Sequence, residues 1–208
     1  MKKTIRIDLH VHSCYSYDAF CSPLSLIKAA KKKGLDGIAL TDHGTCEGWK
    51  EAKKAARKLK MYLILGEEVK CKEGLDILGL WLKREISSRN MEDILEEIHR
   101  QRGVAVLAHP TITEVAKKYL KKFDAIEIFN ARRYNKNSEE FAKKIKLPFT
   151  AGSDAHSHLE VGNAWTGAKA KNLTEFRKKL LKRDVIFFCK KTPVFFRLTS
   201  SIAKFRFF

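Results

Sequence analysis

The stretch DLHVHSCYSYD, residues 8–18, places two histidines one residue apart at the point where an apolar run ends. The preceding run, TIRIDL at residues 4–9, is typical of a β-strand. Two residues at positions i and i+2 of an extended strand point to the same face, roughly 6.5–7 Å apart along the chain. The imidazoles of His10 and His12 can therefore lean toward one metal ion, and we interpret the pair as half of a metal site.

Short apolar runs alternate with helix-like segments along the rest of the chain. The predicted strands occupy residues 4–10, 36–41, 61–70, 75–82, 104–108, 124–129, 148–152, 164–169 and 184–189. The predicted helices occupy residues 23–33, 47–60, 90–102, 113–122, 136–146 and 173–182. Gly34 and Gly103 follow two of these helices, where a left-handed cap is expected. The alternation predicts an α/β fold with a mostly parallel sheet, and the number of units suits a barrel.

The ends of the predicted strands carry most of the histidines. In folds of this class, functional side chains gather at the carboxyl ends of the strands. Five of the seven histidines fall at such ends, and they are His10, His12, His43, His109 and His156. Carboxylates accompany them there, at Asp42, Glu68 and Asp154.

This set of imidazoles and carboxylates predicts a metal centre. An isolated H-x-H pair is more often an ordinary pair of core histidines, but the additional side chains at neighbouring strand ends favour metal binding. Mixed nitrogen and oxygen ligands favour zinc, manganese or iron over calcium or magnesium. There are more candidate ligands than one ion can use, so we expect two or three divalent ions with a bridging carboxylate.

Five motifs carry a resemblance to a known family. DLHVHS, LTDHGT, GEEV, LAHP and AGSDAH resemble, in order and spacing over residues 5–170, the motifs of the PHP family, named for polymerase and histidinol phosphatase. AIEIFNAR also resembles small stand-alone members of that family. The resemblance implies an α/β fold, a distorted (β/α)7 barrel of the PHP type. It also implies two or three bound divalent ions and hydrolysis of phosphate esters.

The resemblance further implies three groups of metal ligands. They are His10, His12, Glu68 and Asp154 for a first ion, Asp18, His43 and His156 for a second, and Glu68 and His109 for a third. Asp76 is a further candidate ligand for the third ion, at a position where the family often has a histidine, so the chain departs from the family's pattern there. Asp18 has an alternative role, because an aspartate side chain can cap a turn. The family's G-x-E pattern selects Glu68 as the ligand, so Glu67 is expected to face the opposite side.

The expected chemistry follows from such a cluster. Divalent ions lower the pKa of bound water from about 15.7 toward about 7 and clamp phosphoryl oxygens. The candidates for orienting water or carrying the proton are Asp42, His43, Asp154 and His156. Arg132, with Arg133 beside it, is the candidate cation for the phosphoryl charge, although both could be ordinary surface arginines. Tyr15 and Trp49 either stack on a substrate ring or are simply packed.

Composition constrains the partners and the compartment. The 208 residues include 42 Lys and Arg against 24 Asp and Glu, a net charge of +18. Such a charge attracts anionic partners, such as nucleotides or nucleic acid, but it also fits a lysine-rich solvated surface. The five cysteines form no C-x-x-C pair and are expected to be free thiols. Without an apolar run of about 20 residues or a secretion signal, the expected location is the cytoplasm.

Two segments are expected along the chain. Residues 1–190 form the phosphoesterase domain, and residues 191–208 form a basic tail whose apolar residues recur at helical spacing. The tail is expected to pack on the barrel or in a dimer, with a membrane surface or another partner as alternatives. The oligomeric state is left open.

Three functions compete at this stage. The expected one is a metal-dependent hydrolase of a small phosphorylated substrate, such as a nucleotide. The first alternative is a 5′-3′ exonuclease on short RNA or DNA, whose affinity would fall steeply with salt. The second is a non-catalytic metal-binding accessory module, which missing ligands would indicate.

Overall fold

The structure is a computed structural model that describes residues 3–110, 114–133, 140 and 145–196. Its strands are β1 (Thr4–Val11), β2 (Gly37–Leu40), β3 (Tyr62–Lys70), β4 (Asp76–Leu80), β5 (Val104–Leu107), β6 (Ala125–Asn130), β7 (Phe149–Gly152), β8 (Ala164–Lys169) and β9 (Ile186–Cys189). Its helices are α1 (Pro23–Lys32), α2 (Trp49–Leu59), α3 (Met91–Arg100), α4 (Glu114–Tyr119), the 3-10 turn η1 (Leu120–Lys122) and α6 (Leu173–Leu181). Each predicted strand is confirmed to within two residues at either end.

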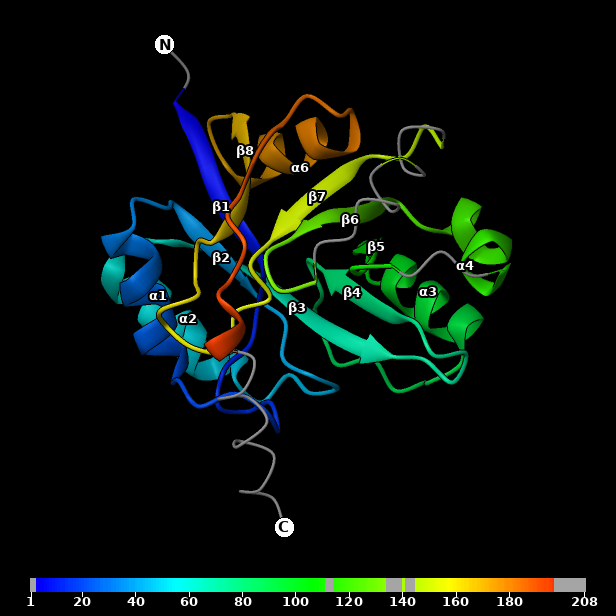
Figure 1. Cartoon of the computed structure of the whole chain (residues 1–208), viewed down its shortest axis with the longest axis horizontal. Coiled ribbons are helices and arrows are strands. Elements are labelled where there is room, and N and C mark those ends of the chain that lie inside the picture. The colour runs from blue at the N-terminus through cyan, green and yellow to red at the C-terminus, as the bar shows by residue number, and fades with distance from the viewer. Residues whose placement is uncertain (1–2, 111–113, 134–139, 141–144, 197–208) are drawn as a thin grey trace.

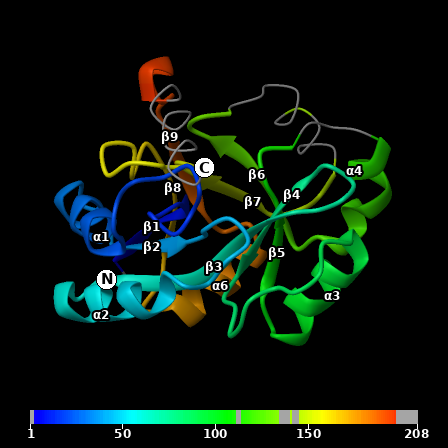
Figure 2. The same ribbon diagram turned by 90° about the horizontal axis from the view of Figure 1, so that it is seen from below.

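The strands form one strongly curled sheet. Their order is β7-β6-β5-β4-β3-β2-β1-β8-β9. The sheet curls until β7 approaches β1 and β8, and the Ala151 N–H donates to Thr166 Oγ1 across that gap. Figures 1 and 2 show the nearly closed barrel with helices on its outside. The expected distorted α/β barrel is therefore confirmed.

The sheet is less parallel than expected. Among the described strands, β1–β2, β2–β3, β5–β6 and β6–β7 pair in parallel, whereas β3–β4, β4–β5, β1–β8 and β8–β9 pair antiparallel. The short turn between β3 and β4, at residues 71–75, explains one antiparallel pair, because so short a connection reverses the chain. The absence of a helix between β7 and β8 in the described chain likewise accompanies a reversal beside β1.

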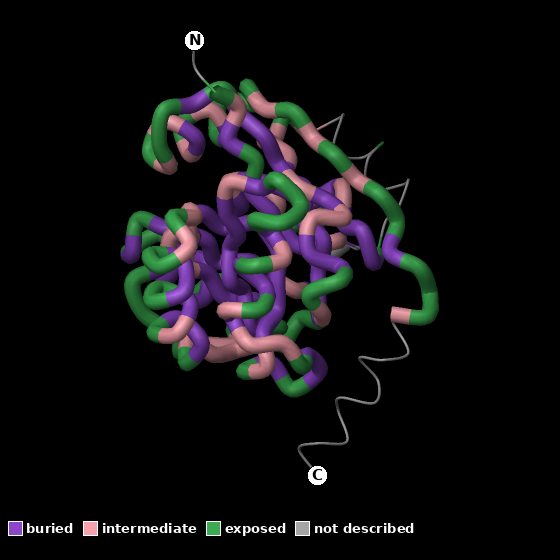
Figure 3. The backbone as a smooth tube through the Cα atoms, turned by 90° about the vertical axis from the view of Figure 1, so that its left-hand side faces the viewer, coloured by how far each residue is buried: buried purple, intermediate pink, exposed green. Residues whose placement is uncertain are grey.

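The buried apolar residues form two large clusters and a small third one: the outer cluster includes residues of α1, α2 and α3, and the inner one includes residues of α6. Figure 3 shows the buried stretches of the chain gathered in the interior of the molecule. The register of β1 against β2 shifts between Asp8 and Val11. As a result, Leu9 packs in the inner cluster with Phe176 and Leu180 of α6, whereas Val11, two residues later, packs in the outer one. A bulge of this kind re-aims the side chains around it. It lies where β1 enters the histidine motif.

One of the two expected left-handed caps is formed and the other is not. Gly34, past α1, has a positive φ of 76°; at the start of the same helix the Ser22 hydroxyl accepts a hydrogen bond from the Ser25 N–H. Past α3, however, the left-handed residue is Arg102 and not Gly103. Gly103 is instead required by close packing, because a Cβ there would lie 2.8 Å from Ile98 Cγ2.

Three further expectations concern membrane-spanning helices, two segments of the chain and the cysteines. Within the described residues, no helix combines the length and the apolar character needed to cross a bilayer. Most of the expected helix at 136–146 and most of the basic tail lie outside the described residues. The five cysteines are free, as expected.

Candidate metal centre

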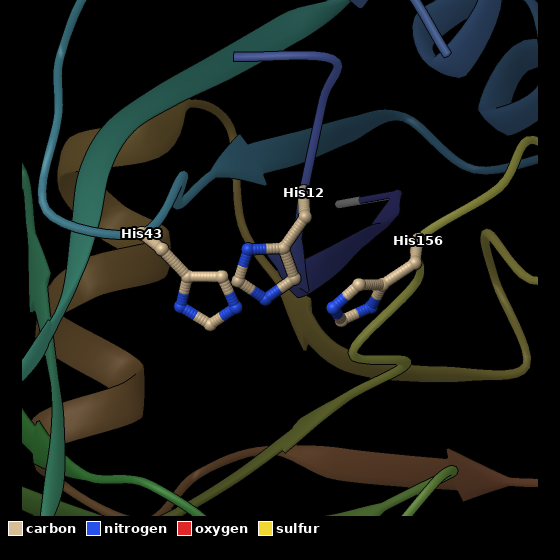
Figure 4. A group of neighbouring side chains, drawn as sticks. All are labelled: His12, His43 and His156. Carbon is tan, nitrogen blue, oxygen red and sulfur yellow. The ribbon is translucent and has the colours of Figure 1, made fainter. Parts of the chain in front are cut away.

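The histidine motifs meet at one end of the barrel, although they come from separate parts of the chain. His12 follows β1, His43 follows β2 and His156 follows β7. Figure 4 shows their imidazoles approaching one another from these three segments. The ring centroids of His12 and His43 are 4.2 Å apart, and those of His12 and His156 are 4.5 Å apart. These approaches bring side chains more than 100 residues apart in the chain into one cluster.

Glu68, on β3, occupies the middle of the cluster. Its Oε2 lies 3.3 Å from Nε2 of both His10 and His12 and 3.0 Å from Nδ1 of His43. Its Oε1 lies 3.0 Å from Nε2 of His109. A carboxylate whose two oxygens face different histidines has the arrangement needed to bridge two cations. Glu67 turns away, as expected, and accepts a hydrogen bond from the Ile86 N–H.

Two aspartates, Asp154 and Asp18, also contact the histidines of the cluster. Asp154 Oδ1 lies 3.3 Å from His12 Nε2. Asp18 places one oxygen 3.5 Å from His43 Nε2 and the other 3.2 Å from His156 Nε2. The Asp18 side chain therefore points into the cluster.

Asp76 belongs to the same neighbourhood from β4. One ligand atom from each of Asp76, Glu68 and His109 lies within 4.8 Å of the others. The structure thus brings together all nine residues predicted to bind metal.

The cluster fits divalent cations on a specific observation. Among the buried side-chain atoms of the described chain that have no hydrogen-bond partner, four belong to this cluster, and they are His10 Nε2, His12 Nε2, Asp18 Oδ1 and Glu68 Oε2. Buried polar atoms are costly when unsatisfied, and here all four belong to groups that donate electron pairs to metals. Imidazole and carboxylate donors together suit zinc, manganese or iron.

The electrostatics of the cluster favour a neutral His12 and an ionised Glu68, whereas burial is outweighed by nearby carboxylates that raise the pKa values of His10, His43 and His109. Burial, reinforced by the neighbouring imidazoles of His43 and His156, lowers the pKa of His12 to about 3. Burial opposes ionisation of Glu68, but the charges of His10 and His43 outweigh it and hold the pKa of Glu68 well below its usual range. A neutral imidazole and an ionised carboxylate are the forms that bind metal.

A cavity of about 280 Å³ opens over the cluster. Beyond the candidate ligands, it is lined by Tyr17, Gly44, Lys70, Arg89 and Arg133. The Tyr17 ring stacks on His43, with centroids 5.0 Å apart. Three basic side chains thus lie within reach of an anion placed over the cluster.

Two candidates for catalytic roles lie away from this cavity. The Arg132 guanidinium is buried, with Nε 2.9 Å from Glu160 Oε1, and it donates to the Phe196 carbonyl. The residue after it, Arg133, lines the cavity instead. Asp42 is buried and accepts hydrogen bonds from Ser13 and Ser16, so it holds a loop.

Neither of the two aromatic candidates belongs to the described lining of the cavity. Trp49 is buried and its indole N–H donates to the Gly66 carbonyl, which confirms the alternative that it is packed. Tyr15 is absent from the described lining of the cavity, where Tyr17 lies instead. Alternation along the irregular loop after β1 could not distinguish these two tyrosines.

Sequence reasoning missed Glu127 and gave Asn130 no role. Both are buried on β6, and Glu127 lies against the His10 ring. The signal available was a glutamate within the otherwise apolar run AIEIF, since a buried carboxylate requires partners. Backbone strain marks the same region. His109 and Asp154 have positive φ values of 24° and 55°, which non-glycine residues rarely adopt.

Comparison with known proteins agrees with this geometry. A model of the PHP domain family matches residues 8–185. An uncharacterised protein of Methanocaldococcus jannaschii, MJ1587, is 32% identical over 143 residues, which cover 61% of this chain and 82% of that protein. A 5′-3′ exoribonuclease of Haemophilus influenzae is 39% identical over 80 residues, 37% of this chain and 29% of the enzyme.

A solved structure shares the fold. It is a two-domain protein from Bacteroides vulgatus containing a predicted PHP-like metal-dependent phosphoesterase, with a TM-score of 0.80 and 20% identity. The match covers 90% of this chain and 65% of that protein. At this identity the likeness supports the architecture only.

Proposed function

Because the chain belongs to the PHP domain family over residues 8–185, we propose that it is a metal-dependent phosphoesterase acting on a small phosphorylated substrate, such as a nucleotide. The observation that carries the proposal is the group of unpartnered, buried ligand atoms beneath a cavity with a basic rim. The unpartnered atoms suit cations, and the basic rim suits an anionic substrate.

We assign the ligands in three groups, each within a short distance in the cluster. They are His10, His12, Glu68 and Asp154, then Asp18, His43 and His156, and finally Glu68, Asp76 and His109. Zinc, manganese or iron suits these donors. Divalent ions held there would polarise a phosphoryl oxygen and lower the pKa of water toward about 7. Residues 1–190 would form this domain.

Arg133 takes the cationic role first considered for Arg132. Its side chain is 62% exposed, and Nη1 lies 3.8 Å from Asp76 Oδ2 while Nε lies 4.0 Å from Asp154 Oδ2. These distances are too long for firm hydrogen bonds, so the guanidinium is free to bind a phosphoryl oxygen. Lys70, on the same rim, adds positive charge. Together they would orient the phosphate and neutralise the charge that develops on it.

The test is a hydrolysis screen on protein loaded with manganese or zinc. The substrates are an aryl phosphate monoester, an aryl phosphate diester, nucleoside bisphosphates and a short 5′-phosphorylated RNA. We expect phosphate release from at least one small substrate. The ligand variant is Asp154→Asn, because asparagine tolerates the positive φ at this position better than alanine.

The matched control is Glu67→Gln, a buried glutamate next to Glu68 whose side chain faces away from the cluster. Activity lost in Asp154→Asn and kept in Glu67→Gln would support the proposal. A protein that binds its metals yet hydrolyses none of the substrates would contradict it and favour the accessory-module alternative.

The second candidate function is exonuclease activity on short RNA or DNA. The partial similarity to the exoribonuclease and the net charge of +18 favour it. A strand that contacts several basic residues releases counterions, so its affinity falls steeply as salt rises. Preference for the RNA in the screen, with a steep salt dependence of KM, would favour the nuclease over the small-molecule enzyme.

A further inference from the structure

Glu127 contacts two of the candidate metal-binding histidines but is itself outside the cluster of ligand atoms. It lies on β6, with its side chain fully buried. Its carboxylate faces the far side of the His10 ring, where Nδ1 is 3.1 Å from Oε1 and 3.2 Å from Oε2. The other ring nitrogen, Nε2, points to Glu68 and Asp154. His10 therefore stands between Glu127 and the candidate metal position.

The hydrogen bonds that Glu127 accepts indicate which nitrogen of the His10 ring carries the proton. Glu127 Oε2 accepts hydrogen bonds from the His109 N–H at 3.2 Å and from Asn130 Nδ2 at 2.9 Å. The carboxylate is an acceptor only, so the His10 nitrogen facing it must be the donor. A neutral His10 then carries its proton on Nδ1, which leaves the Nε2 lone pair free. The same carboxylate also anchors the backbone of His109, whose φ of 24° is strained.

Gly152, on β7, leaves the space in which the side chains of His10 and Glu127 contact each other. A Cβ at this position would lie 2.4 Å from His10 Cβ and 2.7 Å from Glu127 Oε1. Both distances are shorter than a van der Waals contact, so any larger residue at position 152 would displace His10 and Glu127 from each other. The glycine of the AGSDAH motif is thus required by a contact between two other strands.

Two other histidines of the cluster, His12 and His156, have weaker partners on Nδ1, whereas the Nδ1 of His43 lies 3.0 Å from Glu68 Oε2 within the cluster itself. The His12 nitrogen is 3.5 Å from the Ser16 hydroxyl, and the His156 nitrogen is 2.9 Å from the Asp154 carbonyl. Neither partner is charged. A carboxylate partner orients a metal-binding imidazole and raises its basicity more than a neutral partner does.

We infer that Glu127 is a positioning residue that sets the tautomer and orientation of His10 and holds His109, and that it thereby controls metal affinity in one half of the cluster. The half in question contains His10, His109 and Asp154. The half formed by Asp18, His43 and His156 is reached by other contacts. This inference rests on the metal site of the proposed function but not on the reaction.

Glu127→Gln isolates the effect because glutamine has nearly the same shape. If its NH₂ group takes the place of Oε2, it faces two donors, the His109 N–H and the Asn130 amide. If the amide turns around, the NH₂ group faces His10 Nδ1 and requires that nitrogen to be the acceptor. The proton then moves to Nε2, the nitrogen that would bind metal. Either orientation weakens metal binding at His10.

The first measurement is the protonation of the His10 ring by nitrogen-15 NMR, on wild-type protein with and without zinc. We expect the proton on Nδ1 in both forms. In Glu127→Gln we expect that signature to be lost or moved to Nε2. A wild-type His10 whose proton lies on Nε2 and not on Nδ1 would overturn the inference without any variant, so the test survives a Glu127→Gln protein that fails to fold.

The second measurement is a zinc titration followed by calorimetry, with bound metal counted by elemental analysis. We expect Glu127→Gln to lose about 10- to 100-fold in affinity for one class of site and to keep the other. Gly152→Ala should lose the same class, because its Cβ displaces the same pair. The control is Glu67→Gln, whose carboxylate is equally buried but accepts from a backbone N–H away from the cluster.

The outcomes separate the two proposals. If wild type binds no divalent metal, the metal site fails and this inference fails with it. If wild type binds metal and Glu127→Gln binds it with the same affinities, only the role of Glu127 is overturned. Equal losses in Glu127→Gln and Glu67→Gln would also overturn it, because the effect would then be general to a buried glutamate.

Discussion

Arg132 and Arg133 are adjacent in the chain but have different roles: Arg132 forms a buried ion pair, and Arg133 lines the cavity over the cluster. Arg132 turns inward and places its guanidinium beside the buried Glu160. Arg133 turns outward and lines the cavity over the cluster. Asn130 produces this split, because its side-chain oxygen accepts from the backbone N–H of both arginines and fixes a tight turn. Their substitution should therefore have opposite consequences.

The first prediction compares Arg133→Ala with Arg132→Ala. Arg133→Ala should lower kcat/KM by about 10- to 100-fold, the value of a charged hydrogen bond to substrate, and change stability by less than about 0.5 kcal/mol. Arg132→Ala leaves Glu160 buried without its cation and should lower the free energy of unfolding by about 3 kcal/mol. Steady-state kinetics and urea unfolding measure the two effects. A stable Arg132→Ala protein would contradict the structural role.

The second prediction concerns the thiol of Cys189. Burial raises its pKa to about 11 from an ordinary value of 9.0. At pH 8 its thiolate fraction, and so its alkylation rate, should be about 100-fold below that of the unfolded chain. The rate should increase with pH until about pH 11. Because folding favours the protonated thiol, this group makes the folded state less stable as pH rises above 9. Peptide mapping after timed iodoacetamide treatment gives the rate; alkylation as fast as in urea would contradict the prediction.

At the scale of elements, the loop after β1 is held by Asp42, which lies two residues past the end of β2. Asp42 accepts from the Ser13 N–H at 2.6 Å, from the Ser13 hydroxyl at 2.8 Å and from the Ser16 hydroxyl at 2.8 Å. The Ser16 hydroxyl oxygen in turn accepts from the His43 N–H at 3.1 Å. This network ties the loop that carries Asp18 to the strand end that carries His43.

The third prediction follows from that network. Asp42→Ala should lower the free energy of unfolding by about 3 kcal/mol, because three buried donors lose a charged acceptor. Asp184→Ala is the control, since its partner Lys179 forms an exposed pair worth less than about 1 kcal/mol. Urea unfolding of both variants gives the comparison. Equal stabilities would show that Asp42 does not hold the loop.

At the scale of the whole molecule, the barrel brings several buried carboxylates and imidazoles together in one place. Asp18, Glu68 and Asp154 are all buried and lie against imidazoles in one place. Without cations, carboxylates and histidines must neutralise one another there. Ligands that bind only the folded state stabilise it by mass action, so metal binding should be visible in the stability of the entire domain.

The fourth prediction is that metal removal destabilises the protein. A metal present at about 100 times its Kd contributes about 2.7 kcal/mol. For a domain of this size that corresponds to a decrease in Tm of roughly 5–10 °C on adding EDTA. Scanning calorimetry with and without chelator measures it. Asp154→Asn should show a smaller decrease, and an unchanged Tm in wild type would contradict the metal site.

The sequence by itself determined the order of strands and helices and the set of candidate ligands. These features depend on local properties: the period of apolar residues, the turn after residue 71 and the spacing of histidines at strand ends. The choice of Glu68 over Glu67 came from the family's G-x-E pattern, and alternation in a regular strand then placed Glu67 on the opposite side. Each of these properties is decided by residues close together in the chain.

Only the tertiary structure decided which neighbours face the site. Arg133 rather than Arg132, Tyr17 rather than Tyr15, and the structural use of Asp42 all depend on irregular loops, where side-chain direction follows no period. The partnership of Glu127 with His10 joins residues 117 positions apart, and it exists because Gly152 of a third strand leaves room. Such contacts form only when the sheet curls and closes, and no local pattern encodes them.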